Sequence, residues 1–490
     1  MVALRGGAVA VEDDSGASSF ATLGERVARV SGGLAEAGLA GERVAVLVTQ
    51  GAAWIEAFLG VVAAGGVAVP LSPLHPDAER RWFVETSRSR AVVACAEQEP
   101  LARACAGAAR VLRIEQLRAA RPAPPAPTAD TDVAFLLYTS GTTGKPKGAL
   151  STHRNLAATA RLVGAAWRWS AADHLVHALP LHHLHGLGIS LFVSLLAGSA
   201  TRMLPRFDAA RLWDALAGAT VLMGVPTMHR KLLDALDAAD PETQRRWRAS
   251  AGRLRLVTSG SAALPTTVGE RWRELTGAYP VERFGMTEIG VGASNPIDGV
   301  RVPGSCGPVL PGMELRIVGE GGRDVRPGEA GEIWIRGPSV FPGYDANDAA
   351  TREAFTEGWF RSGDTATWLP GGYLKILGRT SVDILKSGGY KLSALELEEL
   401  LREHPAVADA AVVGLPDETW GELAIACVIP RPEHAGTVTE GALRAWAKER
   451  VAPYKVPKRV LVVGELPRNP VGKVVKPELA RWVREQLSGD

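Results

Sequence analysis

The residues from Tyr138 to Leu150, YTSGTTGKPKGAL, have types and spacing that suit the binding of phosphate groups. The run holds three glycines, four threonine or serine side chains and two lysines. Glycines let backbone amides approach an anion closely, hydroxyls donate hydrogen bonds, and ammonium groups add positive charge. The run therefore predicts a loop that holds a polyphosphate.

This loop differs from the two commonest nucleotide-binding loops. A Walker loop has four residues between its glycines and then Lys followed by Ser or Thr. Here two residues separate Gly141 from Gly144, and Lys145 is followed by Pro146, which has neither a hydroxyl nor an amide hydrogen. The Rossmann pattern G-x-G-x-x-G is absent from the run. The sequence predicts a polyphosphate site of another kind, with a polar surface turn as the alternative.

The segments before the loop alternate between helical and strand patterns. Residues 20–39 repeat apolar side chains at helical spacing, whereas residues 43–48 and 133–140 are short apolar runs typical of buried strands. The alternation continues through residues 254–265. It predicts an α/β fold in which helices cover both faces of parallel or mixed sheets.

The pattern changes in the C-terminal part of the chain. Short segments interrupted by Gly and Pro between residues 309 and 377 predict antiparallel strands and hairpins, and a compact α+β pattern follows. We expect a large N-terminal domain over residues 1–378, including a small β-rich subdomain. A hinge at 379–383 and a small α+β C-terminal domain over 384–490 complete the prediction.

Composition and charge argue against several classes of partner. Lys plus Arg number 55 against 53 Asp plus Glu, so no global field attracts nucleic acid or an anionic membrane. The longest apolar stretch, residues 57–71, is shorter than the roughly 20 residues that a membrane span needs. The first 20 residues lack the features of a signal or transit peptide. We expect a soluble cytoplasmic protein with reduced cysteines at Cys95, Cys105, Cys306 and Cys427, which include no CxxC pair.

The loop and seven further motifs resemble the acyl-adenylate-forming enzymes, a group that includes acyl-CoA synthetases, peptide-synthetase adenylation domains and luciferases. The motifs follow the loop in the family's order along the whole chain, which makes the resemblance specific. They are PLHHLHG (180–186), GVPTM (224–228), SGSAALP (259–265), RFGMTE (283–288), WFRSGD (359–364), GRTSVDILKSGGYKLSALELE (378–398) and PRNPVGKV (467–474).

The resemblance implies a two-step reaction that uses ATP, Mg²⁺ and coenzyme A. A carboxylate attacks ATP to form an acyl-AMP, and a thiol then displaces AMP. The implied catalytic residues are Lys473, Glu288 and His183, and Mg²⁺ would be held by Thr139 and Glu288. The implied nucleotide-binding residues are Thr139, Ser140, Gly141, Thr142, Thr143, Gly144, Lys145, Ser261, Ala262, Phe284, Gly285, Met286, Thr287, Asp364 and Arg379.

Several of these residues have distinct implied roles. Asp364 would accept hydrogen bonds from the ribose hydroxyls, and Arg379 would add a donor there. Phe284 stands where the family usually has Tyr, so its ring can stack on adenine without a hydroxyl. Lys473 would bridge the α-phosphate and the reacting carboxylate.

The resemblance also implies that the small domain rotates between the two steps. Ser381 occupies the pivot position, where the family usually has Asp or Lys, and a small residue can still absorb a large backbone change. Ser387, Gly388 and Gly389 would line the channel for the pantetheine arm of coenzyme A, with a plain turn as the alternative.

The acid substrate is predicted from polar residues that resemble those of malonyl-CoA synthetases. His185, Lys231, Ser261 and Arg283 fall where that subfamily binds the second carboxylate. An arginine can hold a carboxylate with paired charge-assisted hydrogen bonds. Arg230 is an alternative to Lys231, and structural roles for Arg283 and His183 remain open.

Other functions stay open beside malonate activation. Methylmalonate, acetate or another short acid could be the substrate, and a carrier protein could replace coenzyme A. A silent nucleotide-binding module is the alternative outside the enzymes. We expect a monomer or weak homodimer with no nucleic-acid or membrane partner.

Overall fold

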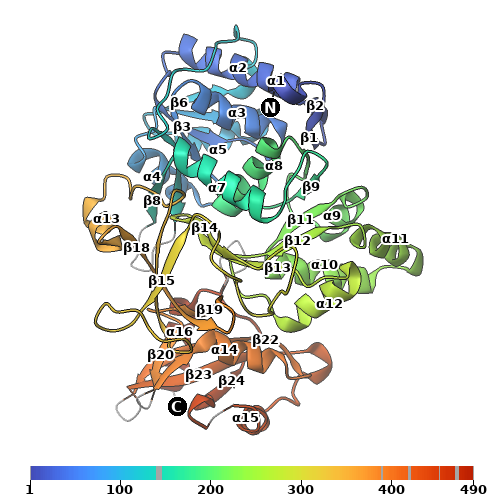
Figure 1. The fold of residues 1–490 in the computed structure, drawn as a ribbon, viewed down its shortest axis with the longest axis vertical. Coiled ribbons are helices and arrows are strands. Elements are labelled where there is room, and N and C mark those ends of the chain that lie inside the picture. The colour runs from blue at the N-terminus through green and yellow to red at the C-terminus, as the bar shows by residue number, and fades with distance from the viewer. Residues whose placement is uncertain are drawn as a thin grey trace.

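The computed structural model describes residues 2–139, 146–387, 390–417, 421–451, 453–468 and 474–488. The N-terminal half, blue to green in Figure 1, forms the upper part of the molecule, and the orange and red C-terminal residues form the lower part. The strands from the middle of the chain lie between these parts. Among the described residues, no helix has both the length and the apolar character that crossing a membrane requires.

The predicted phosphate loop connects the last two strands of the first sheet. It has six strands in the order β6-β5-β3-β4-β7-β8. All neighbours are parallel except β7 and β8, which form a hairpin with Thr139 opposite Lys147. The sequence pattern predicted β3 and β7 but neither β6 nor the strand that follows the loop. The bounds are β3 (Arg43–Leu47), β4 (Val67–Pro70), β5 (Ala91–Ala94), β6 (Arg110–Arg113), β7 (Val133–Thr139) and β8 (Lys147–Thr152).

The second sheet carries most of the other predicted site residues. It has eight strands in the order β14-β13-β12-β11-β9-β10-β1-β2, with antiparallel pairs at both ends. The bounds are β1 (Val9–Asp13), β2 (Gly16–Ser19), β9 (His174–His177), β10 (Ala200–Met203), β11 (Val221–Gly224), β12 (Leu256–Ser259), β13 (Val281–Met286) and β14 (Gly290–Ser294). Together the two mixed sheets, covered by helices, confirm the predicted α/β fold.

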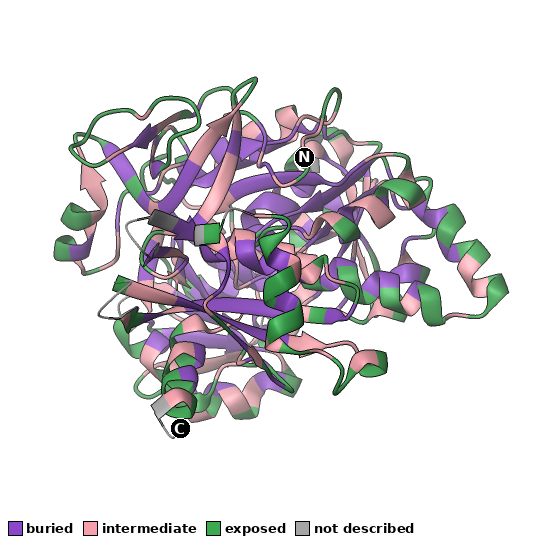
Figure 2. Cartoon of the chain, turned by 90° about the horizontal axis from the view of Figure 1, so that it is seen from below, coloured by how far each residue is buried: buried purple, intermediate pink, exposed green. Residues whose placement is uncertain are grey.

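The helices of this half bury one face against the sheets. In α2 (Phe20–Glu36) the buried residues include Phe20, Leu23, Val30 and Leu34, which recur at helical spacing. Helix α2 packs on α3 (Ala52–Ala63), and both belong to the main apolar core. Figure 2 shows buried residues along the strands and exposed residues on the outer sides of the helices.

The β-rich part follows the predicted antiparallel pattern. A five-stranded sheet contains β15 (Glu314–Val318), β16 (Gly331–Arg336), β17 (Phe355–Thr356), β18 (Trp359–Leu369) and β19 (Tyr373–Arg379). Strands β18 and β19 pair so that Asp364 lies opposite Arg379. The main core extends as far as Leu374.

The C-terminal residues form a separate small α+β unit. Its apolar clusters begin at Leu385 and include none of the main core residues. The elements are β20 (Ile384–Ser387), β21 (Tyr390–Ser393), α14 (Ala394–Arg402), β22 (Val407–Asp417), β23 (Gly421–Pro430), α15 (Glu440–Lys448), β24 (Arg459–Val462) and α16 (Lys476–Ser488). The hinge at 379–383 stays a prediction.

Candidate active site

The phosphate end of the site is formed where β7 ends. Thr139 is half-buried, and its hydroxyl oxygen lies 3.5 Å from Glu288 Oε1 and 3.4 Å from the Lys147 carbonyl oxygen, either of which can accept its hydrogen bond. The structure thus brings together the two residues predicted to hold Mg²⁺. The remaining predicted loop residues, Ser140, Gly141, Thr142, Thr143, Gly144 and Lys145, lie outside the described residues.

Glu288 lies in the tight connection between β13 and β14 and is 5% exposed. The Tyr344 phenol donates a hydrogen bond to its Oε1 at 3.1 Å. Burial raises the pKa of Glu288, while hydrogen bonds from Tyr344 and Thr139 and the charge of Arg379 act in the opposite direction. A buried carboxylate whose pKa is raised by desolvation is suited to a cationic ligand.

The donor set fits a magnesium ion shared with nucleotide. Mg²⁺ usually binds one or two carboxylates together with substrate phosphates and waters. Glu288 and the Thr139 hydroxyl supply such a partial set. Within the described ranges, no group of three or more His, Cys, Asp or Glu side chains could hold a metal on its own.

Asp364 and Arg379 meet on neighbouring strands, as their predicted shared role at the ribose requires. Arg379 Nε lies 3.1 Å from Asp364 Oδ1, and Arg379 Nη1 donates to the Ser362 carbonyl at 2.7 Å. Asp364 is buried. The carboxylate is thereby held in one orientation by a cation, which suits it to accept hydrogen bonds from a ligand.

Six of the predicted nucleotide-binding residues lie at or near two neighbouring strand ends. Phe284 on β13 is 7% exposed and belongs to the main core, so its stacking on adenine stays a prediction. Gly285, Met286 and Thr287 follow it and are half-buried. Ser261 and Ala262 follow β12 and are exposed.

Arg283 is a buried cation with unused hydrogen-bonding capacity. It lies on β13, is 5% exposed, and its Nε and Nη2 have no hydrogen-bond partner among the described residues. Burial lowers the pKa of Arg283 to about 10. Buried donors without partners raise the free energy of the folded protein, and a bound anion that accepts their hydrogen bonds would lower it.

A glycine allows Arg283 to take this position. A Cβ atom on Gly260 would lie 2.5 Å from Arg283 Nε and 2.6 Å from Cζ. Any side chain at Gly260 would therefore displace the guanidinium. Gly260 was not among the predicted site residues, because glycines are common in the turns that follow strands whether or not a site lies nearby.

His185 and Ser261 lie beside Arg283. Ser261 Oγ is 3.4 Å from His185 Nδ1, and His185 Nε2 is buried without a partner in the described part of the chain. Burial and the charge of Arg283 lower the pKa of His185 well below its usual value, so the ring is neutral at neutral pH. Ser261 has φ +69°, a left-handed conformation that is strained for a serine. Three of the four residues predicted for the second carboxylate are therefore grouped.

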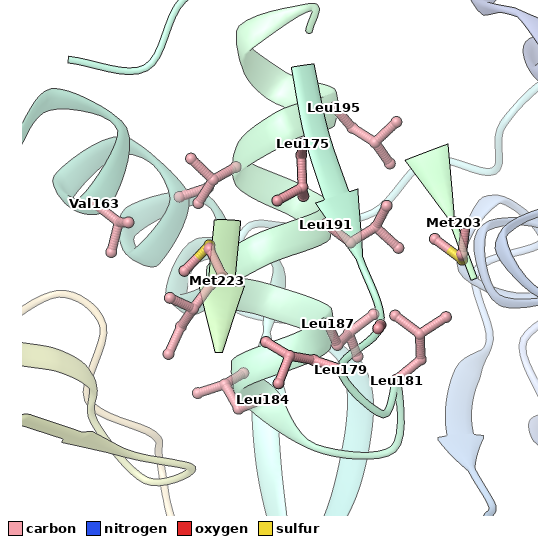
Figure 3. Packing of buried hydrophobic residues seen from close by; sticks show 14 of the residues in the cluster. Val163, Leu175, Leu179, Leu181, Leu184, Leu187, Leu191, Leu195, Met203 and Met223 are labelled. Atoms are coloured by element: carbon pink, nitrogen blue, oxygen red, sulfur yellow. The ribbon is translucent and has the colours of Figure 1, made fainter. Parts of the chain in front are cut away.

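Apolar packing fixes the segment that carries His183 and His185. Residues His185–Leu191 form the π-helical element η2, a conformation often associated with functional sites. Leu184 and Leu187, on either side of His185, are buried in the main core, as Figure 3 shows. His183 Nε2 has no partner among the described residues, and burial lowers the pKa of His183 to about 4.

Lys231 is the predicted carboxylate residue that the structure does not join to the others. It is exposed on α10 (Pro226–Ala238), and no hydrogen bond or ion pair among the described residues links it to Arg283. Its neighbour Arg230 lines a cavity of about 570 Å³ that also includes residues 402–405 of the small unit. Lys231 stays a prediction.

His229 was not among the predicted site residues. It lies on α10 and its side chain is buried in the protein. Its Nε2 donates to the Thr258 carbonyl at 2.9 Å, and its Nδ1 has no partner within the described ranges. Met228, His229, Leu232, Leu233 and Leu236 are buried at helical spacing. That spacing could have identified His229 from sequence.

The predicted residues for the second step are only partly described. Ser381 is exposed in the turn between β19 and β20, and Ser387 is buried at the end of β20. Gly388, Gly389 and Lys473 lie outside the described residues. Their roles stay predictions.

Comparison with known proteins gives a consistent result for nearly the whole chain. The mitochondrial malonate–CoA ligase ACSF3 of Mus musculus is 42% identical over 479 residues, covering 90% of this chain and 81% of the relative. The malonate–CoA ligase of Arabidopsis thaliana is 37% identical, covering 91% and 79%. The ATP-bound crystal structure of MatB from Rhodopseudomonas palustris matches with a TM-score of 0.90 and 35% identity, covering 97% and 96%.

Family models agree with these relatives and with the resemblance found in the motifs. The model for AMP-binding enzymes matches residues 2–345, and that for the AMP-binding enzyme C-terminal domain matches residues 396–473. The first match alone spans more than half of the chain. The chain therefore belongs to the AMP-binding enzyme family.

Proposed function

We propose that this enzyme is an AMP-forming acid–thiol ligase that joins malonate to coenzyme A. Malonate would react with ATP to give malonyl-AMP and pyrophosphate, and the thiol of coenzyme A would then displace AMP. The malonate–CoA ligases among its relatives support this substrate. Among the features of this chain, the buried Arg283, with two nitrogens that have no hydrogen-bond partner among the described residues, carries the proposal.

Malonate has one carboxylate to react and one to be recognised. Arg283 Nε and Nη2 can donate a pair of charge-assisted hydrogen bonds to the second carboxylate. Neutral His185 can donate a further hydrogen bond, and Ser261 lies within reach of that ring. A monocarboxylic acid would leave the guanidinium buried and unpaired, which disfavours it.

The first step requires two anions to meet, and this chain offers cations and donors for both. Thr139 and Glu288 would hold Mg²⁺ against the triphosphate, and Mg²⁺ offsets the charge that develops on the phosphates. Asp364, supported by Arg379, would hold the ribose. Lys473 would bridge the α-phosphate and the reacting carboxylate.

For the second step, the small domain would rotate at 379–383 with Ser381 as the pivot. Ser387, Gly388 and Gly389 would then line the pantetheine channel. We place this activity in the cytoplasm and in a monomer or weak homodimer. Relatives such as the mouse enzyme are named as mitochondrial, so fractionation of the native host is the measurement for location.

The test is pyrophosphate release over a panel of acids with ATP and Mg²⁺, with and without coenzyme A. The proposal predicts that malonate gives the highest kcat/KM and that malonyl-CoA accumulates only when coenzyme A is present. A preference for methylmalonate or acetate would contradict the assignment of malonate. Product formed only with a carrier protein would contradict the thiol assignment, and no acid-dependent release would indicate a silent module.

A further inference from the structure

Residues 341–345, which none of the motifs includes, contact both the strand that follows the phosphate loop and Glu288. Residues 343–345 pair with β8, the strand that follows the phosphate loop. Leu150 donates its amide to the Gly343 carbonyl at 3.1 Å, and the Asp345 amide donates to the Gly148 carbonyl at 2.8 Å. Tyr344 is therefore held opposite Ala149 in an antiparallel bridge. The segment therefore lies alongside β8 in the hairpin formed by β7 and β8, which the phosphate loop connects.

Tyr344 contacts an anion and a cation at this place. Its hydroxyl donates to Glu288 Oε1 at 3.1 Å, and Lys147 Nζ lies 5.2 Å from the centre of its ring. The Thr139 hydroxyl reaches the same oxygen of Glu288. Tyr344 thus restrains one oxygen of the Glu288 carboxylate. The ring also restricts the lysine that begins β8.

The next residue anchors the segment to the first sheet. Arg43 Nη1 and Nη2 lie 2.6 and 2.7 Å from the two oxygens of Asp345, a paired contact that is mostly buried. Arg88 adds a contact at 3.3 Å. Bidentate pairs of this kind fix geometry as well as charge. Tyr344 consequently has little freedom to move away from Glu288.

A second backbone contact holds Glu288 from the same stretch of chain. The Phe341 amide donates to the Glu288 carbonyl at 2.8 Å, and the Phe341 and Tyr344 rings pack with centroids 4.9 Å apart. The backbone of Glu288 and its side chain are therefore both held by residues 341–344. Carboxylates that bind metals are usually held by hydrogen bonds from neighbouring groups in this way.

We propose that Tyr344 is a positioning residue that orients Glu288 toward the nucleotide-bound magnesium ion, with the Asp345–Arg43 pair as its anchor. This inference rests on the proposed function for the presence of ATP and the metal, but not on the identity of the acid. Removal of the hydroxyl would let the carboxylate rotate, and metal affinity in the nucleotide complex would fall. Binding of malonate would not depend on it.

The experiment compares Tyr344→Phe with Tyr373→Phe. The second variant removes a phenol that donates to the Val300 carbonyl at 2.7 Å on the surface, so it is a matched control. Mn²⁺ serves as the probe, and its binding to the enzyme with a non-hydrolysable ATP analogue is measured by electron paramagnetic resonance. The same titration without enzyme corrects for Mn²⁺ bound to the free analogue.

We expect Mn²⁺ to bind about tenfold more weakly in Tyr344→Phe, a loss at the lower end of that for one hydrogen bond to a charged group. Asp345→Asn should weaken Mn²⁺ binding less, because the hydroxyl remains. In Tyr373→Phe the affinity should match that of the native enzyme, and the KM for malonate should stay within about twofold in all three.

Two results would overturn the inference. One is unchanged Mn²⁺ affinity in Tyr344→Phe when its melting temperature shows that it is folded, and the other is equal weakening in Tyr373→Phe. Failure of the proposed function is distinguishable from both. In that case the native enzyme would release no pyrophosphate with malonate, whatever the Mn²⁺ affinities of the variants.

Discussion

Arg283→Met removes the charge that the proposed substrate requires and keeps a side chain of similar length. Arg283 is buried, and its Nε and Nη2 are both free of protein partners among the described residues. A hydrogen bond to a charged group contributes about 1.5–3 kcal/mol. Two such bonds to one carboxylate, discounted for their dependence on each other, give about 3–4 kcal/mol. We therefore expect kcat/KM for malonate to fall by about two to three powers of ten.

The assay is continuous pyrophosphate release with malonate, acetate and ATP varied in turn. The KM for ATP should stay within about threefold, because ATP does not use this guanidinium, and the kcat/KM for acetate should not fall, because acetate leaves the guanidinium unpaired. Arg326→Met is the control variant, since Arg326 is exposed in the loop between β15 and β16 and has no predicted role in the site. The melting temperature of Arg283→Met should not fall, because the substitution removes a desolvated charge without a partner. A malonate kcat/KM close to the native value, or equal losses for malonate and acetate, would refute the reasoning.

Three further predictions test other parts of the site. Lys473→Ala should nearly abolish adenylation yet retain thioester formation from supplied malonyl-AMP; single-turnover measurement of each step checks this, and equal losses would count against it. Gly260→Ala places a methyl group 2.5 Å from Arg283 Nε, so kcat/KM should fall more for malonate than for acetate, and equal kinetics would contradict the packing argument. Burial lowers the pKa of His229 to about 4, below its usual value near 6.5; the neutral ring stabilises the fold fully above pH 6.5, and this contribution is lost as pH falls toward 4. Calorimetry should show that the free energy of unfolding falls by about 3 kcal/mol less between pH 7 and pH 4 in His229→Gln than in the native enzyme. The same pH dependence of unfolding in both proteins would be evidence against it.

Local sequence patterns predicted the elements that need only near neighbours. Strand β7 lies within the apolar run predicted at residues 133–140, and the segments interrupted by glycine and proline form β15, β16 and β19. Motif order predicted that Asp364 would serve with Arg379, and strand pairing places them together. Strand β8 was missed because its pairing depends on β7 across the loop and its first residues read as part of the phosphate motif.

Contacts between distant segments could not be derived from the sequence. Tyr344 reaches Glu288 across 56 residues of chain, and no spacing rule joins a phenol to a carboxylate at that distance. The lack of partners for Arg283 Nε and Nη2 among the described residues likewise depends on which groups the fold brings near them. Lys231 illustrates a different limit. Its position was indicated by the resemblance to malonyl-CoA synthetases, whereas the buried positions of α10 include His229 and not Lys231.

The central claim is that Arg283 receives the second carboxylate of malonate while the first faces the nucleotide. A crystal structure of the enzyme with malonate and a non-hydrolysable ATP analogue tests it most directly. The account predicts one carboxylate within hydrogen-bonding distance of Arg283 Nε and Nη2, and the other beside the α-phosphate. Malonate bound away from Arg283, or a protein side chain occupying both nitrogens, would contradict it.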